Sequence, residues 1–251
     1  LWRIHPGVVA QASATVDRLT KSTFHLGVGT GENMNEGPLG YNFPKYDERA
    51  SRMREALSII RRLLNGEKLD FEGEYYNTKG AKLYSPPLKE VPIWLAAGGL
   101  KSSHLAAEFA DGLMISVKDP EDAYERVINP AQIKTDELGK SQLRIHTYRW
   151  TMFAQNDDDA WESLKSWRGL RAPNRLQEID PQALREQADA LPKEEIMSKF
   201  SRAGTIDELV DIYSPLVKDF GSEVVTIQIS SVNQEETIKL LGKELLPRLK
   251  K

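Results

Sequence analysis

Short apolar runs alternate with amphipathic stretches along this chain of 251 residues, and two of the runs end in glycine-rich turns. The apolar runs lie at residues 24–28, 93–97, 113–117, 143–153 and 224–229. Short buried strands that alternate with helices are typical of a parallel sheet with right-handed crossover connections. The alternation therefore predicts an α/β fold. Both a TIM (β/α)8 barrel and an open doubly wound sheet satisfy this pattern.

Between these runs, apolar residues recur at the spacing of an α-helix. Residues 6–19 form the first predicted helix, which begins at Pro6. Residues 45–64 form the longest, with Met53, Leu57 and Ile60 on one face. Further helices are predicted at residues 102–110, 120–138, 157–170, 181–200, 205–220 and 234–249, with Thr205 and Asn233 as N-caps.

The number of predicted strands falls short of a closed barrel. About five core strands are predicted, and a complete (β/α)8 barrel needs eight. If the sheet forms a TIM barrel, residues 1–251 would make up a single, incomplete barrel domain, with an excursion at about 66–92 and a helical insertion at about 157–200. An open barrel exposes a strand edge and an apolar interior, so we expect a gap or a cover there. The chain starts with Leu1 instead of Met, and we interpret it as part of a longer translation product.

Composition excludes several classes of function. A net charge of −3 provides no general positive field for a nucleic acid. The absence of Cys excludes disulfides, thiolate catalysis and cysteine-ligated metals, and it is compatible with the cytoplasm. The apolar stretches are shorter than the roughly 20 residues that span a bilayer, so no membrane partner is expected. The four histidines, His5, His25, His104 and His146, lack ligand spacing with a carboxylate, so no metal site is predicted.

The first glycine turn carries the most chemical information. Gly29, Thr30 and Gly31 follow an apolar run, and Glu32 and Asn35 come directly after them. Glycines at a strand exit let a ligand approach the backbone, and barrel enzymes place their sites at the carboxyl ends of their strands. Glu32 could exchange a proton or bind a ring edge. The G-x-G-x-G spacing matches a Rossmann fingerprint poorly, and a tight strand exit with a solvated acid is the alternative.

A second glycine turn, Ala97-Gly98-Gly99, follows the next apolar run and precedes a helix. Backbone amides at a helix start can hold a phosphate, although a simple strand-to-helix turn also uses glycine. Ser116 and Lys118 follow the third run, where they could contact a substrate or lie in a solvated loop.

Several stretches together resemble a known family. They are residues 5–12, 26–36, 48–49, 71–76, 82–86, 96–99, 110–112, 188–192 and 246–249. In combination they are similar to the luciferase-like superfamily of oxidoreductases that use coenzyme F420, nearest to its glucose-6-phosphate dehydrogenase branch. The resemblance extends over nearly the whole chain.

The resemblance implies a TIM barrel, coenzyme F420, a homodimer, and hydride transfer between a substrate carbon and C5 of the deazaflavin. It implies that Glu32 lies at the coenzyme ring as a proton donor or acceptor, with Asn35 beside it. It also implies that Ala97, Gly98 and Gly99 hold the coenzyme phosphate.

The chain departs from this family pattern at two places. The family's first three strands, with a catalytic His and a nearby Trp, have no counterpart. The cationic positions of the sugar-phosphate site correspond to Ser198 and to Glu235-Glu236, which would not attract a phosphate. Ser116 preserves a neutral contact and Lys118 is displaced by one place. We therefore expect an alcohol, aldehyde or imine-like substrate. The alternatives are an FMN-dependent luciferase-like monooxygenase, and a non-catalytic truncated barrel that binds a ligand or dimerises.

Overall fold

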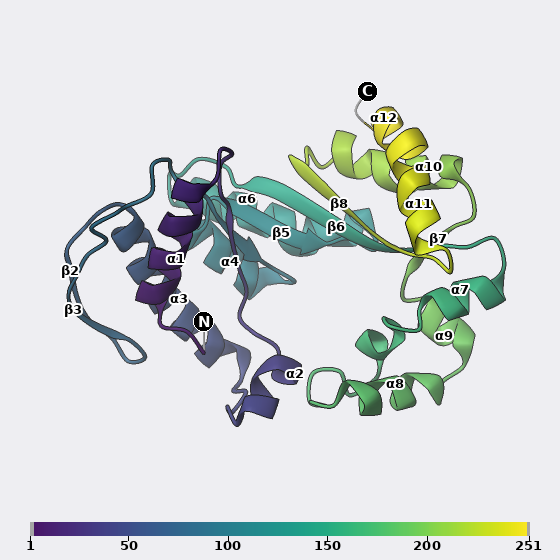
Figure 1. Cartoon of the computed structure of the whole chain (residues 1–251), viewed down its shortest axis with the longest axis horizontal. Coiled ribbons are helices and arrows are strands. Elements are labelled where there is room, and N and C mark those ends of the chain that lie inside the picture. The colour runs from purple at the N-terminus through teal and green to yellow at the C-terminus, as the bar shows by residue number, and fades with distance from the viewer. Residues whose placement is uncertain (1–2, 250–251) are drawn as a thin grey trace. The chain divides into compact units, whose positions relative to one another are not determined.

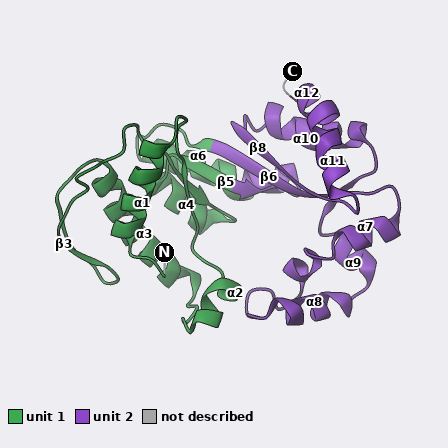
Figure 2. Cartoon of the chain, viewed as in Figure 1, with its two compact units in different colours: residues 1–114, 126–144 green, residues 115–125, 145–251 purple. Residues whose placement is uncertain are grey.

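A computed structural model describes residues 3–249 and divides the chain into two compact units. Unit 1 contains the residues up to Met114 together with Arg126–Arg144, and unit 2 contains Ile115–Glu125 and the residues from Ile145 onward. Figure 2 shows the two units in separate colours. The single-domain arrangement expected from the sequence stays a prediction.

The central-sheet strands of unit 1 run parallel, as the sequence predicts. Strand β4 (Ile93–Ala96) lies between β1 (Leu26–Val28) and β5 (Gly112–Ser116), with Val28 opposite Leu95 and Ala96 opposite Met114. The first three residues of β4 are buried. The prediction of a buried strand at 24–28 is wrong in its extent, because β1 has three residues and is partly exposed. It pairs with β4 alone among the described residues, so it is an edge strand and the barrel is not closed.

Four helices of unit 1 pack around these strands (Figure 1). They are α1 (Pro6–Leu19), α3 (Tyr46–Leu64), α4 (Leu100–Phe109) and α6 (Asn129–Glu137). Helix α3 contacts α1 and α4, and α4 contacts α6. The apolar face predicted for α3 is confirmed, since Met53, Leu57 and Ile60 are all buried. The packing of α3 against α1 and α4 places the first residues of α3 near the carboxyl ends of β1 and β4.

Two short excursions complete unit 1. Helix α2 (Asn33–Glu36) and a 3₁₀ turn at Gly37–Leu39 follow the first glycine turn. Strands β2 (Leu69–Glu72) and β3 (Asn77–Ala81) form an antiparallel hairpin within residues 66–92, where the sequence predicts an excursion. The Glu55 carboxylate on α3 accepts the backbone N–H groups that follow Gly73, at 2.8 to 3.1 Å, and so ties the hairpin turn to the helix.

Unit 2 is built on the long strand β6 (Arg144–Phe153), of which all but the first residue belongs to this unit. It pairs in parallel with β7 (Ser201–Ala203) and with β8 (Val224–Ser230). Helix α10 (Ile206–Lys218) contacts β7 and β8 and begins at the predicted N-cap Thr205, whose side chain accepts the Glu208 N–H. Strand β7 was not predicted, because its three residues directly follow a charged helical stretch. The central sheet therefore has six strands instead of about five.

Two more predicted helices are confirmed as continuous helical stretches. The one predicted at 120–138 consists of α5 (Pro120–Ala123), a π-helical turn at Tyr124–Ile128 and α6, and the one predicted at 234–249 consists of α11 (Gln234–Leu240), a π-helical turn at Leu241–Leu245 and α12 (Leu246–Leu249). The helices between residues 157 and 200 are shorter than predicted: α7 (Asp157–Ser163), α8 (Pro181–Asp189) and α9 (Lys193–Met197). The predicted helix at 181–200 is interrupted between α8 and α9 at Pro192, which lacks the N–H that a continuous helix needs. Within residues 3–249, no helix is long and apolar enough to cross a membrane.

Candidate functional site

The two glycine turns lie side by side in unit 1. Strands β1 and β4 are parallel neighbours with Val28 opposite Leu95, so Gly29 and Ala96 leave the sheet at adjacent positions. A Cβ atom placed on Gly29 would lie 3.9 Å from the Cβ of Ala96. The two strand exits therefore face the same end of the sheet, as a shared ligand site requires.

The first turn presents its polar side chains outward. Gly31 has φ of 86°, a left-handed conformation that favours glycine. Glu32 then starts α2, and its carbonyl oxygen accepts the N–H groups of Asn35 at 3.0 Å and Glu36 at 3.2 Å. The side chains of Glu32 and Asn35 are exposed. Both predicted site residues are therefore accessible at the carboxyl end of β1.

Arg49 holds this first turn in place, a role that sequence reasoning missed. Its Nη1 donates to the carbonyl oxygen of Gly31 at 3.2 Å and to the Thr30 hydroxyl at 3.4 Å. The guanidinium lies over the Phe43 ring, 4.2 Å from its centroid. Burial lowers the pKa of Arg49 from its ordinary value, and interactions with Tyr46 and Glu32 act in the opposite direction. The Glu48-Arg49 pair was a signal of family resemblance, but only the structure reveals its contact.

The second turn has two amides directed at one oxygen atom. The N–H groups of Gly98 and Gly99 both donate to Ser102 Oγ, at 3.0 and 3.2 Å, and this hydroxyl donates to the Gly99 carbonyl at 2.8 Å. Two convergent backbone amides at a helix start have the geometry that binds an anion. Within the described chain, Ser102 Oγ is the acceptor of both amides, and the predicted phosphate contact stays a prediction.

The surroundings of this turn fit a phosphorylated coenzyme. A Cβ atom on Gly98 or on Gly99 would meet nothing within 4 Å, and φ of Gly99 is 177°, which any residue adopts. Neither packing nor backbone conformation within the described chain therefore requires glycine here, whereas close approach of a ligand would. The nearby Tyr46 hydroxyl is buried and lacks a well-formed hydrogen bond among the described residues. Burial raises the pKa of Tyr46 and interaction with Ser102 lowers it by less.

The predicted substrate residues belong to unit 2. Ser116 is the half-buried last residue of β5. Lys118 is exposed, and its Nζ donates to the Ser198 carbonyl oxygen at 2.6 Å. The Glu235 carboxylate pairs with Lys239 at 2.6 Å on the surface of α11. The predicted coenzyme residues thus come together in unit 1, and the two substrate residues lie in the other unit.

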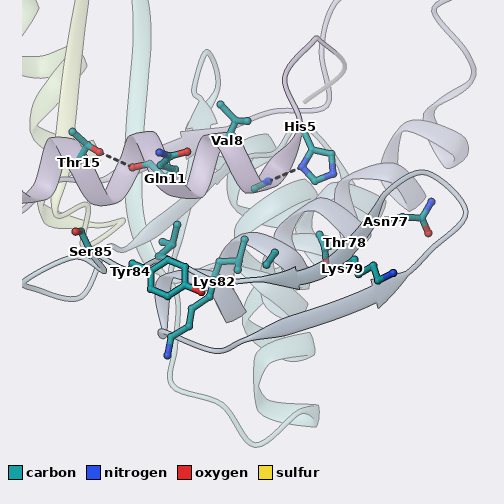
Figure 3. Close-up of a pocket in the computed structure, with 14 residues that line it drawn as sticks. His5, Val8, Gln11, Thr15, Asn77, Thr78, Lys79, Lys82, Tyr84 and Ser85 are labelled. Carbon is teal, nitrogen blue, oxygen red and sulfur yellow. Dashed lines mark hydrogen bonds between the residues drawn. The ribbon is translucent and has the colours of Figure 1, made fainter.

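Two pockets of unit 1 lie away from the glycine turns. One, of about 650 Å³, lies between α1 and β3 and includes His5, Gln11 and Lys82 (Figure 3). Figure 3 shows the Lys82 side chain directed away from α1. The other, of about 670 Å³, is lined by residues such as Arg61, which binds Asp111 at 2.6 Å. Neither pocket contains a predicted site residue.

Comparison with known proteins agrees with this geometry. A sequence profile described as luciferase-like monooxygenase matches residues 1–219. The chain belongs to the luciferase-like family. This membership confirms the resemblance found in the sequence.

Two relatives of this luciferase-like chain are enzymes named F420-dependent glucose-6-phosphate dehydrogenase. The protein from Microbacterium testaceum is 33% identical over 255 residues, which cover 100% of this chain and 76% of the relative. The protein from Mycolicibacterium gilvum is 33% identical over 257 residues with the same coverage. The luciferase-like chain therefore spans about three quarters of the length of these relatives.

Solved structures confirm the fold. An F420-dependent secondary alcohol dehydrogenase, in complex with an F420–acetone adduct, superposes with a TM-score of 0.89 at 26% identity, over 99% of this chain and 76% of that one. The coenzyme F420-dependent tetrahydromethanopterin reductase of Methanopyrus kandleri has a TM-score of 0.79 at 22% identity, over 98% of this chain and 80% of that one. The predicted incomplete barrel of luciferase-like type is thus confirmed as a fold.

Proposed function

We propose that this luciferase-like chain is an oxidoreductase that uses coenzyme F420 and transfers a hydride between a substrate carbon and the deazaflavin ring. The observation that carries the proposal is that the two glycine turns follow the neighbouring strands β1 and β4 and so lie side by side. Space is open next to Gly98 and Gly99 in one turn, and the exposed carboxylate of Glu32 follows the other. The names of the relatives and of the solved neighbour at 26% identity support the same coenzyme.

Each turn has a distinct role in this proposal. The backbone of Gly29, Thr30 and Gly31 approaches the ring, and Asn35 contributes a polar contact beside it. The turn Ala97, Gly98 and Gly99 contacts the phosphate, and the amides of Gly98 and Gly99, which converge on Ser102 Oγ, would be its donors. When bound, the deazaflavin supplies two-electron hydride chemistry. Glu32 then accepts the hydroxyl proton when the substrate carbon is oxidised, or donates a proton to the carbonyl oxygen when that carbon is reduced.

We further propose that the substrate is an alcohol or aldehyde and not a sugar phosphate. The solved neighbour named as a secondary alcohol dehydrogenase supports this choice. Glu235 places a carboxylate at a position that corresponds to a cation in the sugar-phosphate enzymes, and its own partner is Lys239. Ser116 and Lys118 are the proposed substrate contacts. Equal turnover of glucose 6-phosphate and of a simple secondary alcohol would contradict this assignment.

The coenzyme is tested by titrating the purified protein with F420 and, separately, with FMN, with the absorbance or fluorescence of each as the signal. We expect saturable binding of F420 and weak binding of FMN. The family profile is described as a monooxygenase, which gives the FMN alternative its own support. Tight FMN binding without F420 binding would move the assignment to that alternative. F420 binding without turnover of any alcohol would favour a non-catalytic barrel.

A homodimer and a cytoplasmic location stay predictions. Light scattering coupled to size-exclusion chromatography measures the oligomeric state directly. For a homodimer we expect twice the chain mass of 28.3 kDa.

A further inference from the structure

The beginning of helix α3 contacts both glycine turns. Arg49 donates to the first turn at Gly31. Three residues earlier, Tyr46 lies beside Ser102, the acceptor of the amides in the second turn. Between them, Asp47 binds Lys101 at 2.6 Å on the surface. About one turn of a helix therefore reaches two loops that are far apart in the sequence.

The Arg49 contact is specific in its geometry. The carbonyl oxygen of Gly31 and the hydroxyl of Thr30 are both acceptors, and a guanidinium offers several donors in a fixed plane. The Phe43 ring packs against this plane and limits its movement. The carbonyl that Arg49 holds belongs to the residue directly before Glu32, so its position sets where the Glu32 backbone begins.

The second contact passes through one hydroxyl group. Ser102 and its neighbour Ser103 both donate to the Gly99 carbonyl oxygen, at 2.8 and 2.9 Å. Only Ser102 also accepts the N–H groups of Gly98 and Gly99. The buried Tyr46 hydroxyl lies against this same side chain. Ser102 therefore organises the amides, whereas Ser103 secures only the carbonyl.

We propose that Arg49 is a positioning residue and that the amino-terminal turns of α3 hold the two glycine turns at the separation the coenzyme requires. Arg49 fixes the turn that carries Glu32. Ser102 fixes the amides of the second turn, and α3 packs against α4 there with the Asp47–Lys101 ion pair. The inference rests on the proposed function for the identity of the ligand. The arrangement of the two turns is a property of the chain itself and is testable without the coenzyme.

The first test compares the variants Arg49→Met, Arg49→Lys and Arg62→Met in F420 titrations. Arg62 is a matched control, because it lies near the other end of α3 and pairs with Glu67 at 2.8 Å. Loss of a charge-assisted hydrogen bond predicts at least a roughly tenfold rise in the Kd of Arg49→Met. Arg49→Lys should recover part of the affinity, and Arg62→Met should equal the parent protein. Equal affinities for Arg49→Met and Arg62→Met would overturn the proposal.

The second test asks whether the two contacts are coupled. Ser102→Ala should weaken F420 binding severalfold, whereas Ser103→Ala should leave it unchanged. If α3 sets the separation of both turns, the double variant Arg49→Met/Ser102→Ala should raise Kd by less than the product of the single effects. Independent, multiplicative effects would show that the two turns are not held together.

The third test needs no coenzyme. Amide hydrogen exchange of the free protein should accelerate at residues 29–32 in Arg49→Met and at residues 97–99 in Ser102→Ala, with no change at either turn in Arg62→Met. If the parent protein fails to bind F420, the proposed function fails and these exchange rates still decide the positioning role. Unchanged exchange at residues 29–32 in Arg49→Met would exclude that role.

Discussion

Gly112 lies directly against the indole ring of Trp94: a Cβ atom added to Gly112 would stand 2.3 Å from Cε3 of Trp94. These residues are register partners on the adjacent strands β4 and β5. Trp94 is 3% exposed and its Nε1 donates to Nδ1 of His25 at 2.8 Å, so the ring cannot move aside without losing that hydrogen bond. A close contact between two strands thus depends on the absence of one methyl group.

The variant Gly112→Ala should therefore destabilise the protein. Overpacking in a closely packed core costs about 1–3 kcal/mol. The measurement is the free energy of unfolding in urea. Gly242→Ala is the matched control, because a Cβ there meets nothing within 4 Å and the residue lies in a helical turn. If the two variants were equally stable, the contact with Trp94 would be unimportant.

The variant Leu57→Ala tests the packing of α3. Leu57 is 1% exposed, and removal of a buried leucine side chain costs about 2–5 kcal/mol. Leu19, which is 81% exposed at the end of α1, provides the comparison, and Leu19→Ala should change the free energy of unfolding by less than about 0.5 kcal/mol. Thermal or urea unfolding of both variants measures the difference. A loss below about 1 kcal/mol for Leu57→Ala would mean that this helix contributes little to the core.

The variant Glu32→Gln separates proton transfer from coenzyme binding. The amide keeps the shape of the side chain but cannot exchange the proton, so kcat should fall by about 10²–10⁴ while the Kd for F420 changes little. Steady-state kinetics and a binding titration give the two quantities. Glu137→Gln, an exposed change on α6, should leave both unaltered. Full activity in Glu32→Gln would assign proton transfer to another group.

The buried hydroxyl of Tyr213 leads us to predict that the free energy of unfolding decreases at high pH. Burial raises the pKa of its hydroxyl from 10.0 to about 12, and Thr151 and Arg149 lower it by less. Because the folded state holds this proton more tightly than the unfolded state, the stabilisation is complete below pH 10 and is lost between pH 10 and 12. A difference of two pH units corresponds to at most about 3 kcal/mol.

The measurement is the free energy of unfolding from pH 8 to 12 for the parent protein and for Tyr213→Phe. The variant loses the hydrogen bond to Thr151, which has a length of 2.8 Å, and starts from a lower stability. Its curve should fall less steeply above pH 10, since other titrating groups are common to both proteins. Parallel curves for the two proteins would mean that Tyr213 titrates normally.

The sequence by itself determined the elements that depend on local periodicity and on turn chemistry. The bounds of α1 agree with the prediction, and those of α3, β4 and β5 differ from it by one or two residues. Both glycine turns were recognised because glycine interrupts an apolar run at a strand exit. The extent of β7 and the division of the helices between residues 157 and 200 were not predicted, because short charged segments have no distinctive period.

Only the tertiary structure decided which groups meet. Arg49 and Gly31, and Trp94 and Gly112, are joined by strand register and helix packing. The contact of Ser102 with the amides of Gly98 and Gly99 is local by comparison, since Ser102 caps the start of α4. Residue spacing encodes which face a side chain occupies on its own element, whereas the contacts between elements follow from how those elements pack. The sequence could therefore indicate the two turns, and their support by α3 became visible only in the folded chain.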